Sequence, residues 1–186
     1  MANIDKALKV LFEAEFDNMP QRFLHRNKTE NFLTLGGVNQ KANPYNIDWK
    51  FCEDMIDICD GAITRASNML FYDETIQNQV KTVFLNKYWN VLNLSKINSQ
   101  LIANEIFLFG VVSGIRNGGK LAQKIAGVVE DGIIGNISIG AINKLDDLYF
   151  SQRYDNLEIL YFQNLVDHNA NLSIYMNGWK KRALMV

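Results

Sequence analysis

The fold is decided first by the stretch Ile4–Phe16, which reads IDKALKVLFEAEF. Its apolar residues recur every three or four positions, the spacing of one face of a helix: Ile4, Ala7, Leu8, Leu11 and Phe12. At about 100° per residue, Glu15 falls on this stripe and Glu13 points away from it. A carboxylate on an apolar face resists ionisation unless it is paired, and a general acid working near neutral pH needs that environment. Glu15 is therefore a candidate catalytic acid, unless the helix ends near residue 14 and leaves it solvated.

Helical spacing continues along most of the chain and predicts an all-α protein. The expected helices after the first cover residues 47–59, 62–70, 74–91, 97–115, 120–128, 138–144 and 157–177. Residues 97–115 are the most apolar and predict a buried central helix, and Trp89 continues an apolar stripe that predicts a core position. Residues 17–47 are polar, contain both prolines and predict an irregular loop with room for a small β element.

Composition limits the class of protein. With 186 residues, of which 48% are hydrophobic, the chain can bury a substantial core, as one domain or two closely packed lobes. The net charge of −1 argues against a nucleic-acid partner, and no apolar run reaches the roughly 18 residues of a membrane span. No secretory signal region is visible, so we expect synthesis in the cytoplasm.

The two cysteines, Cys52 and Cys59, are predicted to be reduced core residues. They lie seven positions apart, about two helical turns, which is too far along one helix for a disulfide. The chain has no CxxC motif and no Cys/His cluster of the kind that binds zinc, so we expect neither a metal nor a cofactor.

Two separated parts of the chain resemble the lysozymes of glycoside hydrolase family 108. Asn3–Glu15 is similar to the opening of that family, where a helix leads into a Glu-Gly-Gly-Tyr motif with a catalytic Glu, and counting without gaps places Glu15 on it. Thr34–Gln40 resembles the family's Thr-Asn-Tyr-Gly-Ile-Thr element, with Thr34 and Gly37 matching. Phe16–Asn18 departs from the family pattern, because it replaces the two glycines and the tyrosine.

The second resemblance lies in the later half. Asp131–Ser138 is similar to the Asp-Gly-Ile-Ile-Gly-Pro-Lys-Thr signature of the predicted peptidoglycan-binding region that accompanies this family. Tyr88-Trp89 and Gly178–Arg182 add further matches. The resemblance implies a lysozyme-like catalytic half over residues 1–95 and a helical half over 96–186. The second half has no linker, so we expect it to be integral to one compact domain, with Asp131 in a turn or capping role rather than at a ligand.

The resemblance implies an N-acetylmuramidase that cleaves peptidoglycan glycan strands as a monomer, in the manner of a phage endolysin released through a separate pore. Such a reaction uses a protonated acid, here Glu15, and usually a second carboxylate. Glu30 is the first candidate for the second group and Asp17 the runner-up. Thr34 is expected to position the attacking water. The expected substrate contacts are His25, Asn27, Tyr45 and Trp49, the last two at the rim of the cleft.

Two other functions fit the same sequence. A lytic transglycosylase needs only one acidic residue, because the sugar's own hydroxyl attacks. A non-catalytic protein that binds the cell wall or assists secretion is the alternative from another class, because some members of the family are described as secretion activators and the residues after Glu15 are changed.

Overall fold

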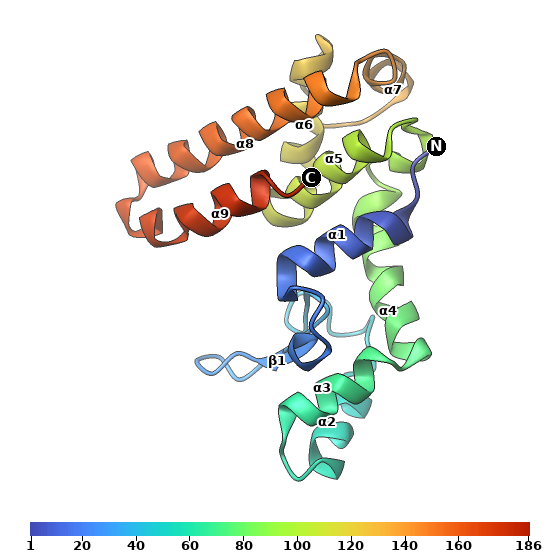
Figure 1. Ribbon diagram of the computed structural model, residues 1–186, viewed down its shortest axis with the longest axis vertical. Coiled ribbons are helices and arrows are strands. Elements are labelled where there is room, and N and C mark those ends of the chain that lie inside the picture. The colour runs from blue at the N-terminus through green and yellow to red at the C-terminus, as the bar shows by residue number, and fades with distance from the viewer. The chain divides into compact units, whose positions relative to one another are not determined.

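The computed structural model describes residues 1–186 and is mostly helical, with one small sheet (Figure 1). The α-helices are α1 (Ile4–Phe16), α2 (Trp49–Ile58), α3 (Ile63–Phe71), α4 (Glu74–Phe84), α5 (Gln100–Ser113), α6 (Ile115–Ala126), α7 (Asn136–Ile142), α8 (Asp147–His168) and α9 (Met176–Ala183). The strands are β1 (Leu24–Arg26), β2 (Leu33–Leu35) and β3 (Val38–Asn39). The predicted helical fold with a small β element inside residues 17–47 is confirmed. None of the helices is long and apolar enough to cross a membrane.

Side-chain caps explain where several helices begin. Asp48, Asp73, Ser99 and Asp146 each accept a hydrogen bond from the backbone N–H three residues later, at the starts of α2, α4, α5 and α8. The predicted last helix, 157–177, was wrong at both ends. Asp146 starts α8 ten residues earlier, and the chain leaves the helix after His168 before α9 begins.

The chain divides into two compact units. The hairpin unit contains Leu11–Asn86, and the bundle unit contains Met1–Val10 together with Lys87–Val186. One division therefore falls between residues 86 and 87. The sequence had predicted a boundary between residues 95 and 96. It also groups the first ten residues with the later half of the chain.

The hairpin unit is built around the three-stranded antiparallel sheet, in the order β1-β2-β3. Leu24, Leu33, Leu35 and Val38 are buried, and α3 packs against β1. Ser67 links α3 to β1 and to the segment before it, because its Oγ accepts a hydrogen bond from Leu24 N at 2.8 Å and donates one to Pro20 O at 2.5 Å. A cluster of edge-to-face and tilted rings, Phe12, Phe16, Phe23 and Phe71, fills the space between α1, α3 and the sheet.

The two cysteines and Trp89 take the places predicted for them. Cys52 and Cys59 are buried free thiols, and burial raises the pKa of Cys52 to about 12, which keeps it in the unreactive thiol form. Trp89 is buried and meets Phe107 edge to face.

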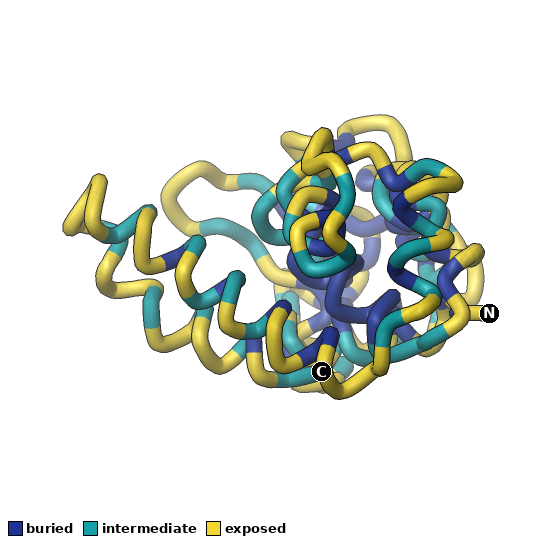
Figure 2. The backbone as a smooth tube through the Cα atoms, turned by 90° about the horizontal axis from the view of Figure 1, so that it is seen from above, coloured by how far each residue is buried: buried dark blue, intermediate teal, exposed yellow.

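The bundle unit is organised by α5, which is buried on nearly all sides from Ile102 to Gly110. A helix that is apolar all round belongs in a core. Glycines let α6 approach it closely, because a Cβ at Gly118 would lie 2.9 Å from Ile106 O and 3.1 Å from Gly110 Cα. Along the helices that lead to the C-terminus, buried and exposed residues alternate in Figure 2, as expected of elements with one packed face.

The Asp-Gly-Ile-Ile-Gly stretch forms a turn that is held by α6. Gln123 is buried; its Nε2 donates to Asp131 Oδ1 at 2.7 Å and its Oε1 accepts from Gly132 N at 2.7 Å. Gly132 has φ +79°, and a Cβ there would lie 2.7 Å from Arg116 O. The hydrogen bond from Gln123 lowers the pKa of Asp131. Asp131 therefore has the turn-forming role that the sequence predicted.

Candidate functional site

Glu15 lies in the last turn of α1 and is exposed, which corrects the prediction of a carboxylate on the buried face. The buried stripe continues from Leu11 to Phe16 instead, because the Phe16 ring completes the aromatic cluster. The Glu15 side chain lies against the turn between β2 and β3, where a Cβ at Gly37 would be 3.3 Å from Glu15 Cγ. Gly37 has φ +84°, a backbone conformation that residues with a Cβ rarely adopt, and its missing side chain leaves space for Glu15.

A hollow of about 470 Å³ opens beside Glu15 in the hairpin unit. It is lined by residues from the end of α1, the turn that follows, β1 and the start of α3: Glu15, Phe16, Gln21, Arg22, Leu24, His25, Arg26, Lys28, Ile63 and Thr64. Glu15 is the one carboxylate among them. The hollow therefore combines an acid at its wall with neutral polar, apolar and basic side chains.

Sheet register brings His25 and Thr34 to the same face. His25 of β1 is paired with Thr34 of β2, and Thr34 is paired with Asn39 of β3. Residues opposite one another on neighbouring strands project to the same side, about 4.5–5.5 Å apart at Cβ. Two of the predicted site residues are thus neighbours, and His25 is also in the wall of the hollow with Glu15.

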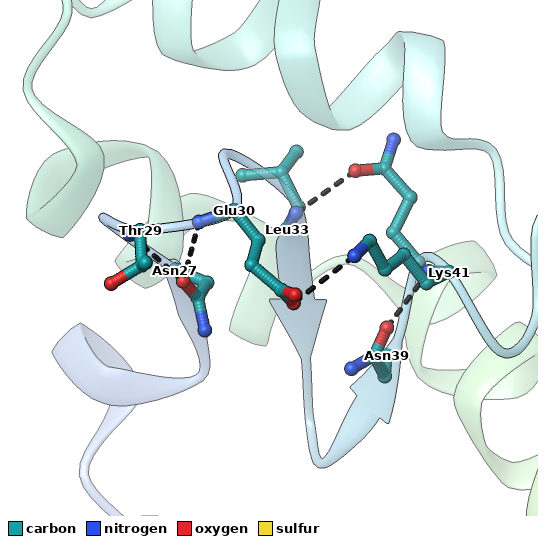
Figure 3. A network of polar contacts seen from close by, with 7 residues as sticks. Asn27, Thr29, Glu30, Leu33, Asn39 and Lys41 are labelled. Carbon is teal, nitrogen blue, oxygen red and sulfur yellow. Dashed lines mark hydrogen bonds and ion pairs between the residues drawn. The ribbon is translucent and has the colours of Figure 1, made fainter.

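The structure does not bring Glu30 or Asn27 into the lining of this hollow. Glu30 is exposed in the turn after β1 and forms an ion pair with Lys41 at 3.1 Å (Figure 3). Asn27 holds the same turn, since its Oδ1 accepts from the backbone N–H groups of Thr29 and Glu30, both at 2.9 Å. The contacts of both residues thus lie within the hairpin and not in the hollow.

Asp17, the second candidate for the other carboxylate, pairs with Arg22 at 2.6 Å. Asp17 and Asn18 both have left-handed backbone angles, φ +55° and +52°. These residues stand where the resembled family has Gly-Tyr, and Asp and Asn are the side chains that tolerate this conformation best. The turn after Glu15 therefore has a left-handed backbone at two successive residues.

The placement of Trp49 at the cleft rim was wrong, whereas Tyr45 is fully open to solvent. Trp49 is 6% exposed and its indole Nε1 donates to Asn43 O at 2.9 Å, so it anchors the start of α2 in the core. Tyr45 is 95% exposed, but it is not among the residues that line the hollow beside Glu15.

Sequence reasoning missed most of the hollow's wall. Arg22, Arg26 and Lys28 are close together in the sequence, and this basic spacing next to His25 was a signal that could have been used. Ile63 and Thr64 gave no such signal, because only the packing of α3 against β1 brings them there.

A second group of ionisable side chains is buried in the bundle unit, between α5 and α8. Glu105 and Glu158 are 1% and 4% exposed, and Ser151 Oγ donates to Glu105 Oε1 at 2.5 Å. The pKa of Glu105 is raised to about 8 and that of Glu158 to about 9, chiefly by burial and to a smaller extent by repulsion from Asp155. No group of three His, Cys, Asp or Glu side chains is placed to hold a metal ion. The buried glutamic acids are neutral packing groups.

Comparisons with known proteins bear on the fold. No family model and no curated protein sequence matches the chain. Among solved structures, the chain is similar to the one titled "Structure of Brucella abortus SagA", with a TM-score of 0.58 and 16% sequence identity. The match covers 97% of this chain and 92% of SagA. The chain therefore shares the fold of SagA along nearly its whole length.

Proposed function

We propose that this protein is a peptidoglycan hydrolase that cleaves the N-acetylmuramic acid–N-acetylglucosamine linkage with Glu15 as general acid. The observation that carries the proposal is the position of Glu15, which is the one carboxylate in the wall of a hollow of about 470 Å³ in the hairpin unit. The same residue falls on the catalytic Glu of the resembled lysozymes. The fold shared with SagA is compatible with this function but says nothing of the reaction.

The proposed reaction uses the exposed position of Glu15. In the unbound protein Glu15 is exposed to water, and a glycan strand seated in the hollow would exclude that water from its carboxyl group. Glu15 then donates its proton to the glycosidic oxygen as the bond to the sugar breaks. The Glu15 carboxylate left by this step then takes a proton from the attacking water, as the oxygen of that water bonds to the anomeric carbon of the sugar. His25 and Thr34, which share one face of the sheet, are the groups proposed to position the attacking water.

A lytic transglycosylase is the second candidate, and a specific observation favours it. Glu30 is paired with Lys41 and does not line the hollow, and Asp17 is paired with Arg22. With one carboxylate in the wall, attack by the sugar's own hydroxyl needs no second acidic group. Hydrolysis leaves a reducing end, whereas transglycosylation leaves an anhydro sugar that is lighter by one water.

The test is digestion of purified peptidoglycan by the wild-type protein and by Glu15→Gln, with products identified by mass spectrometry. We expect reducing-end fragments from the wild type and a loss of at least about 10²-fold in Glu15→Gln, the lower end of what general acid catalysis contributes. Glu13→Gln is the matched control, because Glu13 is also exposed on α1 but does not line the hollow. An equal loss in both variants would reject the assignment of Glu15. Anhydro products would establish the transglycosylase, and an inactive wild type would favour the non-catalytic binding protein.

A further inference from the structure

The hollow beside Glu15 carries an excess of positive charge. Arg22, Arg26 and Lys28 lie in its wall together with His25, against the single carboxylate of Glu15. The whole chain has a net charge of −1, so this concentration of cations is local. A concave surface lined by one sign of charge attracts ligands of the opposite sign.

Two of the three cations are available to a ligand. Arg22 is already paired with the Asp17 carboxylate, which offsets its charge. Arg26 donates only to the neutral Asn31 Oδ1, at 3.3 Å, and Lys28 has no ion-pair partner among the residues described. Arg26 is the last residue of β1 and Lys28 lies in the turn that follows it, two positions further along the chain, and both line the hollow.

The remaining wall is suited to a sugar. Leu24, Phe16 and Ile63 provide apolar surface, and Gln21 and Thr64 provide neutral hydrogen-bonding groups for hydroxyl or acetamido substituents. A neutral glycan such as chitin offers hydroxyl and amide oxygens to a guanidinium and an ammonium, but no negative charge. A guanidinium is matched to a carboxylate by two parallel hydrogen bonds, and an ammonium adds a point charge.

We infer that Arg26 and Lys28 bind carboxylates of the substrate, so that the hollow selects glycans that carry acidic peptide or lactyl groups over neutral glycans. The inference rests on the proposed function for the sugar part of the ligand. It adds two specificity-determining residues that take no part in bond cleavage. Arg26 and Lys28 bind the anionic substituent, while Glu15 contacts the glycosidic oxygen.

The test is a binding titration with a fragment that the proposed reaction cannot cleave. The probe is the N-acetylglucosaminyl-N-acetylmuramyl-tetrapeptide, and its partner is the same compound with every carboxylate converted to an amide. We expect the wild-type protein to bind the acidic probe at least tenfold more tightly than the amidated one. In Arg26→Gln/Lys28→Gln this preference should fall below twofold, with affinity for the amidated probe unchanged. The matched control is Lys50→Gln/Arg65→Gln, which removes two cations of the same unit that do not line the hollow and should keep the preference.

Each result is decisive for the inference. Equal affinity for the two probes, no measurable binding of the acidic probe, or an equal loss in the control variant would overturn it. Lys28→Gln alone tests the point without disturbing the hairpin, because Lys28 has no ion pair to lose, and it should lower the preference at least threefold. Peptidoglycan digestion is measured separately. Cleavage without charge-dependent binding rejects the inference alone, whereas charge-dependent binding without cleavage rejects the hydrolase and leaves the inference standing.

Discussion

At the scale of single residues, ionisable groups of this chain fall into two environments with opposite consequences. Glu15 is exposed at the wall of a hollow, where a ligand can change its surroundings. Glu105 and Glu158 are enclosed between helices, where nothing but the protein contacts them. Burial raises the pKa of Glu105 and Glu158 although both are packing groups, because desolvation shifts a pKa wherever burial occurs.

The buried glutamic acids predict a loss of stability as the pH rises. Unfolded Glu105 releases its proton near its ordinary pKa of 4.5, whereas the folded protein keeps it until about pH 8. Between these values the unfolded chain binds fewer protons, so the free energy of unfolding falls with increasing pH, by at most about 1.4 kcal/mol per pH unit for each such group. Melting temperatures at pH 5, 7 and 8.5 measure this slope.

Glu105→Gln should flatten that pH profile and raise the melting temperature at pH 8.5, since a neutral amide oxygen can still accept from Ser151. At pH 5 it should melt close to the wild type. The control is Glu130→Gln, which changes an exposed residue and should leave the profile as it is. A wild-type profile in Glu105→Gln would mean that Glu105 ionises freely in the folded protein.

Glu30 gives a second prediction at this scale. Its side chain and that of Lys41 are 53% and 57% exposed, and such surface pairs contribute about 0–1 kcal/mol. Glu30→Gln should therefore keep peptidoglycan digestion within about threefold of wild type, an effect of at most about 0.7 kcal/mol in the barrier, with little change in melting temperature. A loss of digestion rate above tenfold would instead identify Glu30 as the second carboxylate of the reaction.

At the scale of elements, glycines decide how closely helices and turns approach. Gly118 on α6 faces the backbone of α5, and Gly119 faces the backbone of Gly132, where a Cβ would lie 2.7 Å from its carbonyl oxygen. Backbone cannot move aside as a flexible side chain can. The Asp-Gly-Ile-Ile-Gly turn is therefore a packing motif of the bundle unit, with glycine required on both sides of the contact.

Gly118→Ala should lower the free energy of unfolding by about 1–3 kcal/mol, because the added methyl group overlaps Ile106 O and Gly110. Gly140→Ala is the control: Gly140 is exposed within α7, a methyl group added there would meet nothing within 4 Å, and the variant should gain about 0.5–1 kcal/mol from helix propensity. Urea denaturation of the two variants measures both. Equal stability of the two would show that α6 can shift away from α5 at no cost.

At the scale of the whole molecule, the chain order and the compact units do not coincide. Residues 1–10 belong with the bundle unit, where Ala2 N donates to Ile97 O at 2.8 Å and Asn3 N donates to Gln100 Oε1 at 2.7 Å. Helix α1 continues from there into the hairpin unit, so one helix contributes to both cores.

A fragment of residues 95–186 should accordingly be poorly folded. It lacks the first ten residues and also Trp89, Leu92 and Leu94, which are buried in the bundle unit. A fragment of residues 87–186 restores these three side chains. Its thermal transition, measured by circular dichroism, should be sharper than that of the 95–186 fragment, with a melting temperature still below that of the full chain. A cooperative fold in 95–186 that also binds cell-wall material would establish an independent module instead.

The sequence by itself determined most of the helices and much of the core. Periodicity located α1, α2, α3 and the buried α5, and turn-forming residues located the small sheet, because these are local properties of a few neighbouring side chains. It also placed Cys52, Cys59 and Trp89 in the core. The end of the chain was predicted less well, since a missed Asp146 cap moved the start of α8 by ten residues.

Only the tertiary structure decided what surrounds each candidate residue. Helix phase placed Glu15 on the apolar stripe, but the Phe16 ring took the buried position and left Glu15 at the wall of the hollow. Strand register made His25 and Thr34 neighbours, and the packing of α3 against β1 completed the wall. Burial and electrostatic environment depend on residues far apart in the sequence that meet only when the chain folds. Local sequence patterns therefore could not predict the burial or the electrostatic environment of these residues.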